Sequence, residues 1–181
     1  MNSTSLSRAI TRIAHQILEK DPDIENLGII GMQRRGVFLA KRIASEIERI
    51  TDVAVATGSL DITLYRDDYR NKVNQPVARA TDIPFNVDGM GLLLVDDVLY
   101  TGRTARAALD ALMDFGRPAY IRLAVLVDRG HRELPIRADF TGKKITTARN
   151  QKVRLSIKEI DRADTLDLVE LEQGDDDVPR D

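Results

Sequence analysis

Residues 92–104 join an apolar run, two adjacent acids and a turn of small residues. The apolar run, 92–95, has strand length, and Asp96 and Asp97 follow it directly. At the carboxyl end of a strand, where open α/β sheets bind ligands, carboxylates can accept hydrogen bonds from sugar hydroxyls and hold Mg²⁺, directly or through water. Residues 101–104 follow at the start of a predicted helix, where unpaired N–H groups and the helix dipole favour a phosphate. The segment predicts a phosphorylated-sugar site; a helix N-cap after solvated acids is the alternative.

A second turn, residues 31–36, has the glycine spacing of a P-loop. Val37 and Phe38 follow where that motif needs a lysine and a hydroxyl residue, which excludes a P-loop ATPase or GTPase. Arg34, Arg35 and Gly36 instead form a basic turn that suits a second anion such as pyrophosphate. Two solvent-facing arginines before a helix are the alternative interpretation.

The elements that must position these turns alternate between strand and helix patterns. Apolar residues at helical spacing from Leu6 to Ile17 predict a first helix, which ends before Pro22 because the residue preceding a proline avoids the helical conformation. A strand, a glycine turn and a helix then follow in order, which is typical of an α/β fold. The further predicted elements are strands at 27–30, 53–64, 92–95 and 119–127, helices at 37–50 and 104–115, and short strands near 138–140 and 153–157 that finish the sheet.

Residues 65–81 carry charges, Asn, Gln and Pro without an apolar period. A loop beyond about 12 residues inside a compact domain is commonly a binding loop or a lid. We therefore expect a lid over the site in this segment.

The composition limits the classes of protein to which this chain can belong. The chain has 181 residues, which suits one domain, expected over residues 1–171, with an acidic and disordered tail at 172–181. The absence of cysteine excludes disulfides, cysteine-bound zinc, iron–sulfur clusters and a thiol nucleophile. No apolar run reaches the ~18 residues of a membrane span, and the first residues lack an apolar signal core. A soluble, cytoplasmic protein without a membrane partner is expected.

The charge is unevenly distributed along the chain. The whole chain has 27 Lys+Arg and 29 Asp+Glu, a net charge of −2. Residues 117–154 carry ten Lys+Arg and three acids, whereas residues 155–181 carry three and ten. A basic block in a folded region attracts phosphates or nucleic acid, and two halves of a neutral surface are the alternative.

These segments resemble a known family. Residues 92–104 are similar to the 5-phosphoribosyl-1-pyrophosphate (PRPP) signature of type I phosphoribosyltransferases. Residues 11–15 (TRIAH), 61–68 (DITLYRDD) and 126–137 (LVDRGHRELPIR) resemble the PyrR family, and the resemblance runs from about residue 6 to residue 170. PyrR proteins are pyrimidine operon regulators and uracil phosphoribosyltransferases. The resemblance implies a mainly parallel central sheet with flanking helices, a flexible lid and a small hood.

The resemblance also implies roles for individual residues. Asp96 and Asp97 would bind the ribose hydroxyls and Mg²⁺, and the pyrophosphate loop, which often holds a non-proline cis peptide, would contain Arg34, Arg35 and Gly36. Arg66 of the lid would approach pyrophosphate. The remaining residues expected to bind PRPP or UMP are Val98, Leu99, Tyr100, Thr101, Gly102, Arg103 and Thr104, with Val127, Asp128 and Arg129 on the base side.

The resemblance has two departures. Tyr100 stands where many purine phosphoribosyltransferases have an acid that assists proton transfer at the base. A tyrosine, with an ordinary pKa near 10, is a poor base at neutral pH, so no single general base is assigned. The stretch before the first helix is also short, which leaves the contacts usually made there unassigned.

The resemblance implies a second activity, binding of pyrimidine operon leader mRNA in response to UMP, and the charge pattern agrees with it. One helix face and the basic block would supply the surface for RNA phosphates and an exposed loop. Its expected residues are Arg8, Thr11, Arg12 and His15 on the helix, and His131, Arg132, Arg137, Lys143, Lys144, Arg149 and Lys152 in the block. With four Phe, four Tyr and no Trp, the chain does not predict an aromatic stacking platform.

Three alternatives stay open at this point. Each basic residue alone can be an ordinary solvated charge. The chain can also be a purine salvage phosphoribosyltransferase without RNA regulation, or a non-catalytic regulator with a phosphoribosyl domain. A homodimer that pairs two basic faces is the smallest assembly expected, with higher oligomers open.

Overall fold

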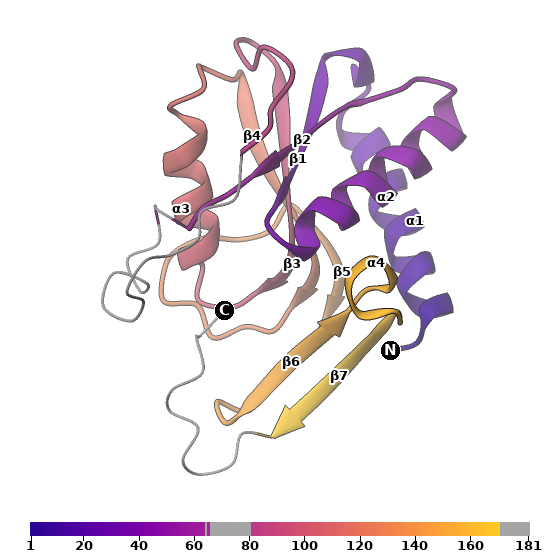
Figure 1. Cartoon of the computed structure of the whole chain (residues 1–181), viewed down its shortest axis with the longest axis vertical. Helices are drawn as coiled ribbons and strands as arrows, with labels where there is room; N and C mark the ends of the chain where they lie inside the picture. The colour runs from indigo at the N-terminus through magenta and orange to yellow at the C-terminus, as the bar shows by residue number, and fades with distance from the viewer. Residues whose placement is uncertain (64, 66–80, 171–181) are drawn as a thin grey trace.

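A computed structural model describes residues 1–63, 65 and 81–170. Five parallel strands form the central sheet in the order β2-β1-β3-β4-β5 (Figure 1). Because the strands are parallel, their carboxyl ends gather at one edge, as the paired residues Gly31 and Val95, and Leu99 and Asp128, show. The elements are α1 (Ser3–Lys20), a 3₁₀ turn (Ile24–Asn26), β1 (Leu27–Met32), α2 (Arg35–Thr51), β2 (Ala56–Leu60), β3 (Gly91–Leu99), α3 (Arg103–Leu112), β4 (Tyr120–Asp128), β5 (Phe140–Lys144), β6 (Gln151–Ser156), α4 (Lys158–Asp161) and β7 (Thr165–Glu170).

Helices cover both faces of the sheet, and each face has its own apolar core. Leu93 and Val95 of β3 pack with α1 and α2, whereas Leu92 and Leu94 pack with α3. Strands buried on both faces explain the continuous apolar run that the sequence shows at 92–95. The predicted α/β class and mainly parallel sheet are confirmed.

A second, antiparallel sheet of β6 and β7, together with α4, forms a small unit that we call the hood, residues 151–170 (Figure 1). The prediction that residues near 153–157 finish the central sheet is wrong. Val153 and Leu155 instead pack from the hood into the core shared with α1. The sequence interpretation also missed α4 and β7, because half-exposed strands and a four-residue helix carry little periodicity.

Element ends differ from the sequence prediction where tertiary pairing sets them. β3 continues through Asp96 and Asp97 to Leu99, because its pairing with β4 continues to Asp128. Residues 31 and 32 belong to β1 and Arg35 to α2, which leaves a turn shorter than the predicted loop at 31–36. β2 is shorter than the predicted strand at 53–64, and α3 ends before the predicted residue 115.

Two predicted segments lie outside the described residues. They are most of the expected lid, including Arg66, and the expected tail at 172–181. In the described part of the chain, no helix is long and apolar enough to cross a membrane.

Candidate functional site

The two acids lie near the carboxyl end of β3. Asp96 is 9% exposed and Asp97 is half-buried. One oxygen of Asp96 accepts the backbone N–H of Asp97 at 2.8 Å, and one oxygen of Asp97 accepts that of Val98 at 2.7 Å. These local bonds fix both carboxylates at the sheet edge, beside the start of α3.

The turn after β3 prepares the N-terminus of α3. Gly102 has φ +93°, a left-handed conformation that glycine adopts without strain, and it is the N-cap of the helix. The buried Thr101 hydroxyl accepts the N–H of Arg103 at 3.3 Å, and the Thr101 carbonyl accepts the N–H groups of Glu133 and Leu134. The turn is thereby held against the loop that contains Glu133 and Leu134, with the positive end of a ten-residue helix beside it.

The basic turn reaches the same sheet edge from β1. A Cβ on Gly36 would lie 2.4 Å from the carbonyl oxygen of Val95, so only glycine lets the start of α2 approach β3 this closely. The Gln33–Arg34 peptide bond is cis, which agrees with the feature expected of a pyrophosphate loop. Arg34 is exposed and has no hydrogen bond or ion pair within the described residues.

Arg35 is instead paired with the hood. Its guanidinium donates to Asp161 of α4 at 3.1 and 3.3 Å. Two hydrogen bonds to the Asp161 carboxylate hold its pKa below the usual range. The bond from the Ile157 N–H has the larger effect, and the bond from Arg35 has the smaller one. Sequence reasoning missed Asp161, since a lone acid in a charged stretch gives no signal.

The residues expected on the base side lie at the carboxyl end of β4 and directly after it. Val127 is buried, Asp128 is half-buried, and Arg129 is buried with its guanidinium 3.9 Å from the centre of the Tyr100 ring. The ring of His131 lies 6.1 Å from the Tyr100 ring in an edge-on arrangement. Tyr100 is therefore packed by cationic and aromatic neighbours, at the end of the same strand that carries the acids.

Arg132 belongs to the framework of this site. Its guanidinium donates to the carbonyls of Tyr100 at 2.6 Å and Ile136 at 3.0 Å, and forms an ion pair with Asp128 at 2.6 Å. It also donates to the carbonyls of Leu99 and Gly130. These contacts tie the 128–137 loop to the turn after β3, a role that differs from the RNA contact expected of Arg132.

The two parts of the predicted RNA surface lie beside each other. Arg8, Arg12 and His15 are exposed on α1, and the Arg12 guanidinium donates to the carbonyl of Gly142 in β5. Lys143 and Lys144 follow Gly142 and are exposed. The other members of the set are His131, Arg137 and Arg149, which are exposed, and Thr11 and Lys152, which are half-buried.

The described residues contain no cluster of three or more His, Cys, Asp or Glu side chains that could hold a metal. Asp96 and Asp97 nevertheless fit Mg²⁺, because this ion keeps several waters and is usually bound by one or two carboxylates together with substrate phosphates.

Solved structures place this architecture among the phosphoribosyltransferases. The hypoxanthine phosphoribosyltransferase of Trypanosoma cruzi matches with a TM-score of 0.70 at 17% identity, over 95% of both chains. The hypoxanthine phosphoribosyltransferase of Staphylococcus aureus matches with a TM-score of 0.66 at 17% identity, over 88% of this chain and 84% of that one. At this identity the likeness shows the fold alone.

Sequence comparisons define the family. Residues 2–159 match the phosphoribosyl transferase domain family. The bifunctional protein PyrR of Deinococcus radiodurans is 53% identical over 95% of this chain and 94% of its own length. The bifunctional protein PyrR of Roseiflexus sp. is 56% identical over 89% of this chain and 88% of its own.

Fold and sequence together define a type I phosphoribosyltransferase. Within that class, the chain belongs to the PyrR family.

Proposed function

We propose that this protein transfers the phosphoribosyl group of PRPP to uracil, giving UMP and pyrophosphate, and binds pyrimidine operon leader mRNA when UMP is present. Membership of a family whose proteins are named bifunctional supports both activities. The observation that carries the proposal is the meeting of Asp96, Asp97, the 101–104 turn and the 34–36 turn at one sheet edge.

Each group at this edge matches one part of PRPP. The N-terminus of α3 suits the 5-phosphate, because its N–H groups and dipole favour a dianion. The carboxylates of Asp96 and Asp97 suit the ribose hydroxyls, as acceptors of hydrogen bonds. The exposed Arg34 suits the pyrophosphate on the opposite side of the sugar.

The reaction demands stabilisation of two developing charges. Uracil N1 displaces pyrophosphate from C1 of the ribose through a transition state with cationic character on the sugar. Asp96 and Asp97 place negative charge near that cation, and Arg34 offers donors to the leaving group. Mg²⁺ held by Asp96 and Asp97, directly or through water, would neutralise the phosphates of the substrate.

The basic surface supports the second activity. The Arg12 side chain contacts β5 at Gly142, and the exposed Lys143 and Lys144 follow in that strand, so cations of α1 and β5 lie close together, which suits the phosphates of an RNA loop. UMP regulates this contact only if it binds the RNA-competent form better than the other form. A homodimer or higher oligomer in the cytoplasm, built of domains spanning residues 1–171, completes the proposal.

UMP formation from PRPP and uracil, measured during a Mg²⁺ titration, tests the first activity. Hypoxanthine, guanine and orotate serve as competing bases, and a preference for a purine would favour a purine salvage enzyme instead. Absence of turnover with any base, together with UMP-dependent RNA binding, would favour a non-catalytic regulator.

A leader-RNA mobility shift with and without UMP tests the second activity. Repetition at several salt concentrations separates specific binding from general attraction to phosphates, because each phosphate contact steepens the salt dependence. Binding that ignores UMP would contradict the regulatory part of the proposal.

A further inference from the structure

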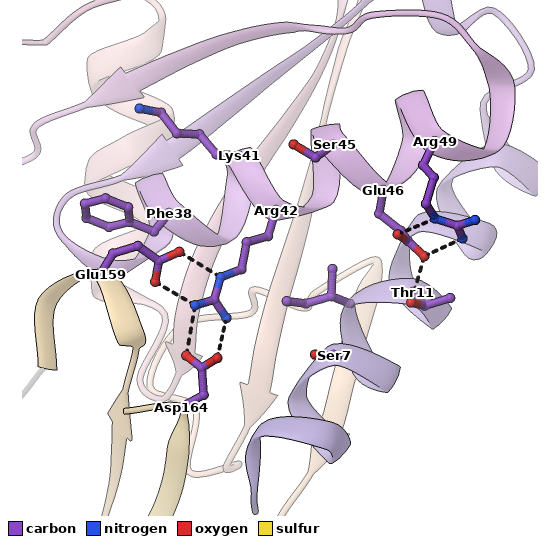
Figure 2. A pocket seen from close by; sticks show the side chains of 11 residues that line it. Ser7, Thr11, Phe38, Lys41, Arg42, Ser45, Glu46, Arg49, Glu159 and Asp164 are labelled. Carbon is purple, nitrogen blue, oxygen red and sulfur yellow. Dashed lines mark hydrogen bonds and ion pairs between the residues drawn. The ribbon is translucent and has the colours of Figure 1, made fainter. Parts of the chain in front are cut away.

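A groove of about 650 Å³ lies between α1, α2 and the hood (Figure 2), and neither Asp96 nor Asp97 lines it. Phe38 gives it an apolar wall, and the hydroxyls of Ser7, Thr11 and Ser45 line it. Thr11 also belongs to the residues expected to contact RNA. The groove therefore adjoins the predicted RNA surface.

A hydrogen-bonded chain connects this shared residue to a cation on α2. The Thr11 hydroxyl donates to Glu46 at 2.8 Å, and Glu46 accepts from Arg49 at 2.9 Å at both of its oxygens (Figure 2). These bonds, first from Arg49 and then from Thr11, lower the pKa of Glu46 to about 2. Glu46 thus stays ionised and holds Arg49, whose side chain is 64% exposed, beside Thr11.

The charges at the two ends of the groove differ. At the hood end, Arg42 is bound between Glu159 and Asp164, with N–O distances of 2.6 and 2.8 Å, so this cluster has a net charge of −1 and its arginine is fully paired (Figure 2). Lys41 is exposed on the rim, and its side chain has no ion pair or hydrogen bond with any described residue. Arg49 is paired with Glu46, but its side chain is 64% exposed, so Lys41 and Arg49 are the cations that a phosphate chain crossing the rim would meet.

We propose that this groove binds one unstacked nucleotide of the leader RNA, an inference that rests on the RNA activity proposed above. Sequence-specific RNA recognition commonly uses bases that are splayed out of a loop and bound on their hydrogen-bonding edges. The three hydroxyls and the carboxylates offer partners for such an edge, and Phe38 offers an apolar wall. Lys41 and Arg49 contact the flanking phosphates, which extends the RNA surface from α1 onto α2.

Variants at Ser45 test the occupancy of the groove. In the full-length protein, Ser45→Trp fills the groove, and Ser45→Ala keeps its shape. We expect Ser45→Trp to weaken UMP-dependent binding of the leader transcript at least about tenfold and Ser45→Ala less than about twofold, with UMP formation unchanged in both. Equal RNA binding by the two variants would overturn the proposal.

Charge variants test the rim. Lys41→Ala and Arg49→Ala are each expected to reduce the slope of log affinity against log salt by about one. Arg117→Ala is expected to leave the slope unchanged, because Arg117, although the first cation of the basic block, is not among the residues expected to contact RNA and lies on the exposed loop that leads to the amino end of β4. An unchanged slope in both rim variants would overturn the assignment of phosphate contacts to them.

The absence of cysteine allows a direct readout that does not depend on affinity. Alkylation of a thiol introduced by Ser45→Cys is expected to slow when leader RNA and UMP are added, whereas alkylation of Arg117→Cys does not change. Slow alkylation that depends on protein concentration and not on RNA would assign the groove to contact between copies of the chain and overturn the proposal. If the wild-type protein binds no leader RNA, the proposed RNA activity itself is wrong. If Arg12→Ala weakens RNA binding but Ser45→Trp binds RNA normally, only the proposed role of the groove is wrong.

Discussion

The carboxylate of Asp97 has a structural role, which the structure shows, and a proposed chemical role. One of its oxygens accepts the N–H of Val98, which fixes the backbone at the end of β3. An asparagine offers a neutral oxygen for the same hydrogen bond. It lacks the negative charge that the sugar cation and Mg²⁺ need.

We therefore expect Asp97→Asn to lose most turnover and keep its fold. Removal of one well-aimed electrostatic group costs about 3 to 4 kcal/mol in the barrier, which corresponds to a drop in kcat of more than about a hundredfold. Initial rates of UMP formation and the thermal midpoint measure the two effects. Asp110→Asn on the exposed face of α3 is the matched control. Near-normal UMP formation by Asp97→Asn would refute the role of this acid.

Arg132, which is predicted to contact RNA, also has framework contacts that the sequence did not predict. Because its guanidinium donates to carbonyls on both sides of the site, Arg132→Ala removes several charge-assisted bonds and leaves their acceptors unpaired. We expect a loss of about 2 to 4 kcal/mol in the free energy of unfolding, and weaker UMP formation as well as weaker RNA binding. Denaturant unfolding and both activity assays check this. Normal UMP formation together with a loss of RNA binding would instead support a direct contact between Arg132 and RNA.

At the scale of elements, two arginines of α2 attach the hood to the main domain. Arg35 pairs with Asp161, and Arg42 pairs with Glu159 and Asp164. The contacts couple α2, which starts at the expected pyrophosphate turn, to the hood. Movement of the hood is therefore expected to move that turn.

We expect Arg42→Ala to lower the free energy of unfolding by about 1 to 2 kcal/mol, because it leaves the exposed Glu159 and the half-buried Asp164 without their cation. Arg106→Ala, which removes an exposed i,i+4 pair, is the control and should cost about 0.5 kcal/mol. Denaturant melts of the three proteins give these values. Similar costs for both variants would mean that the hood attachment adds nothing beyond a surface pair.

The same attachment predicts a dependence on pH. Hydrogen bonds from Arg42 lower the pKa of Glu159. Burial raises the pKa of Asp164, but hydrogen bonds from Arg42 and from the Lys158 N–H outweigh this effect, so the pKa of Asp164 is also lowered. A lowered pKa in the folded state contributes stability that is complete above the ordinary value of about 4 and is lost as the pH falls through the lowered value. The difference in Tm between wild type and Arg42→Ala should therefore narrow below about pH 4. A constant difference down to about pH 2 would contradict this account.

At the scale of the whole molecule, the residues expected for the two proposed activities come mainly from different elements. The residues expected to bind PRPP lie at the carboxyl edge of the central sheet, and Arg12 of α1 contacts β5, which carries the two lysines expected to bind RNA. β4 and β5 are adjacent strands, and the loop after β4 carries residues of both sets. A bound nucleotide can therefore act on the RNA surface through this loop.

We expect Arg12→Ala and His15→Ala to keep UMP formation and to lose RNA binding about tenfold or more, because both residues lie on the polar face of α1. Arg117→Ala serves as the charge control. Parallel measurement of kcat and of leader-RNA affinity with UMP checks the separation. Equal loss of both activities would mean that the surfaces are not distinct.

The sequence alone determined the features that depend on neighbours along the chain. The spacing from Leu6 to Ile17 predicted α1 and its end before Pro22, and the run at 92–95 with its acids and turn predicted the order strand, acids, helix. The resemblance to the PyrR family was confirmed by relatives more than half identical. The roles given to individual residues stay predictions.

Tertiary structure decided what depends on contacts between distant residues. Val153 and Leu155 alternate with polar residues in a pattern that fits any half-buried strand, and only packing against the core shared with α1 places them in a separate hood. Arg35, Arg42 and Arg132 look like solvated charges along the chain, yet each is bound to acids or carbonyls that are 2 to 126 positions away. The periodicity of a sequence indicates which residues face an apolar core. It does not indicate which charged group will lie opposite a given side chain in the folded protein.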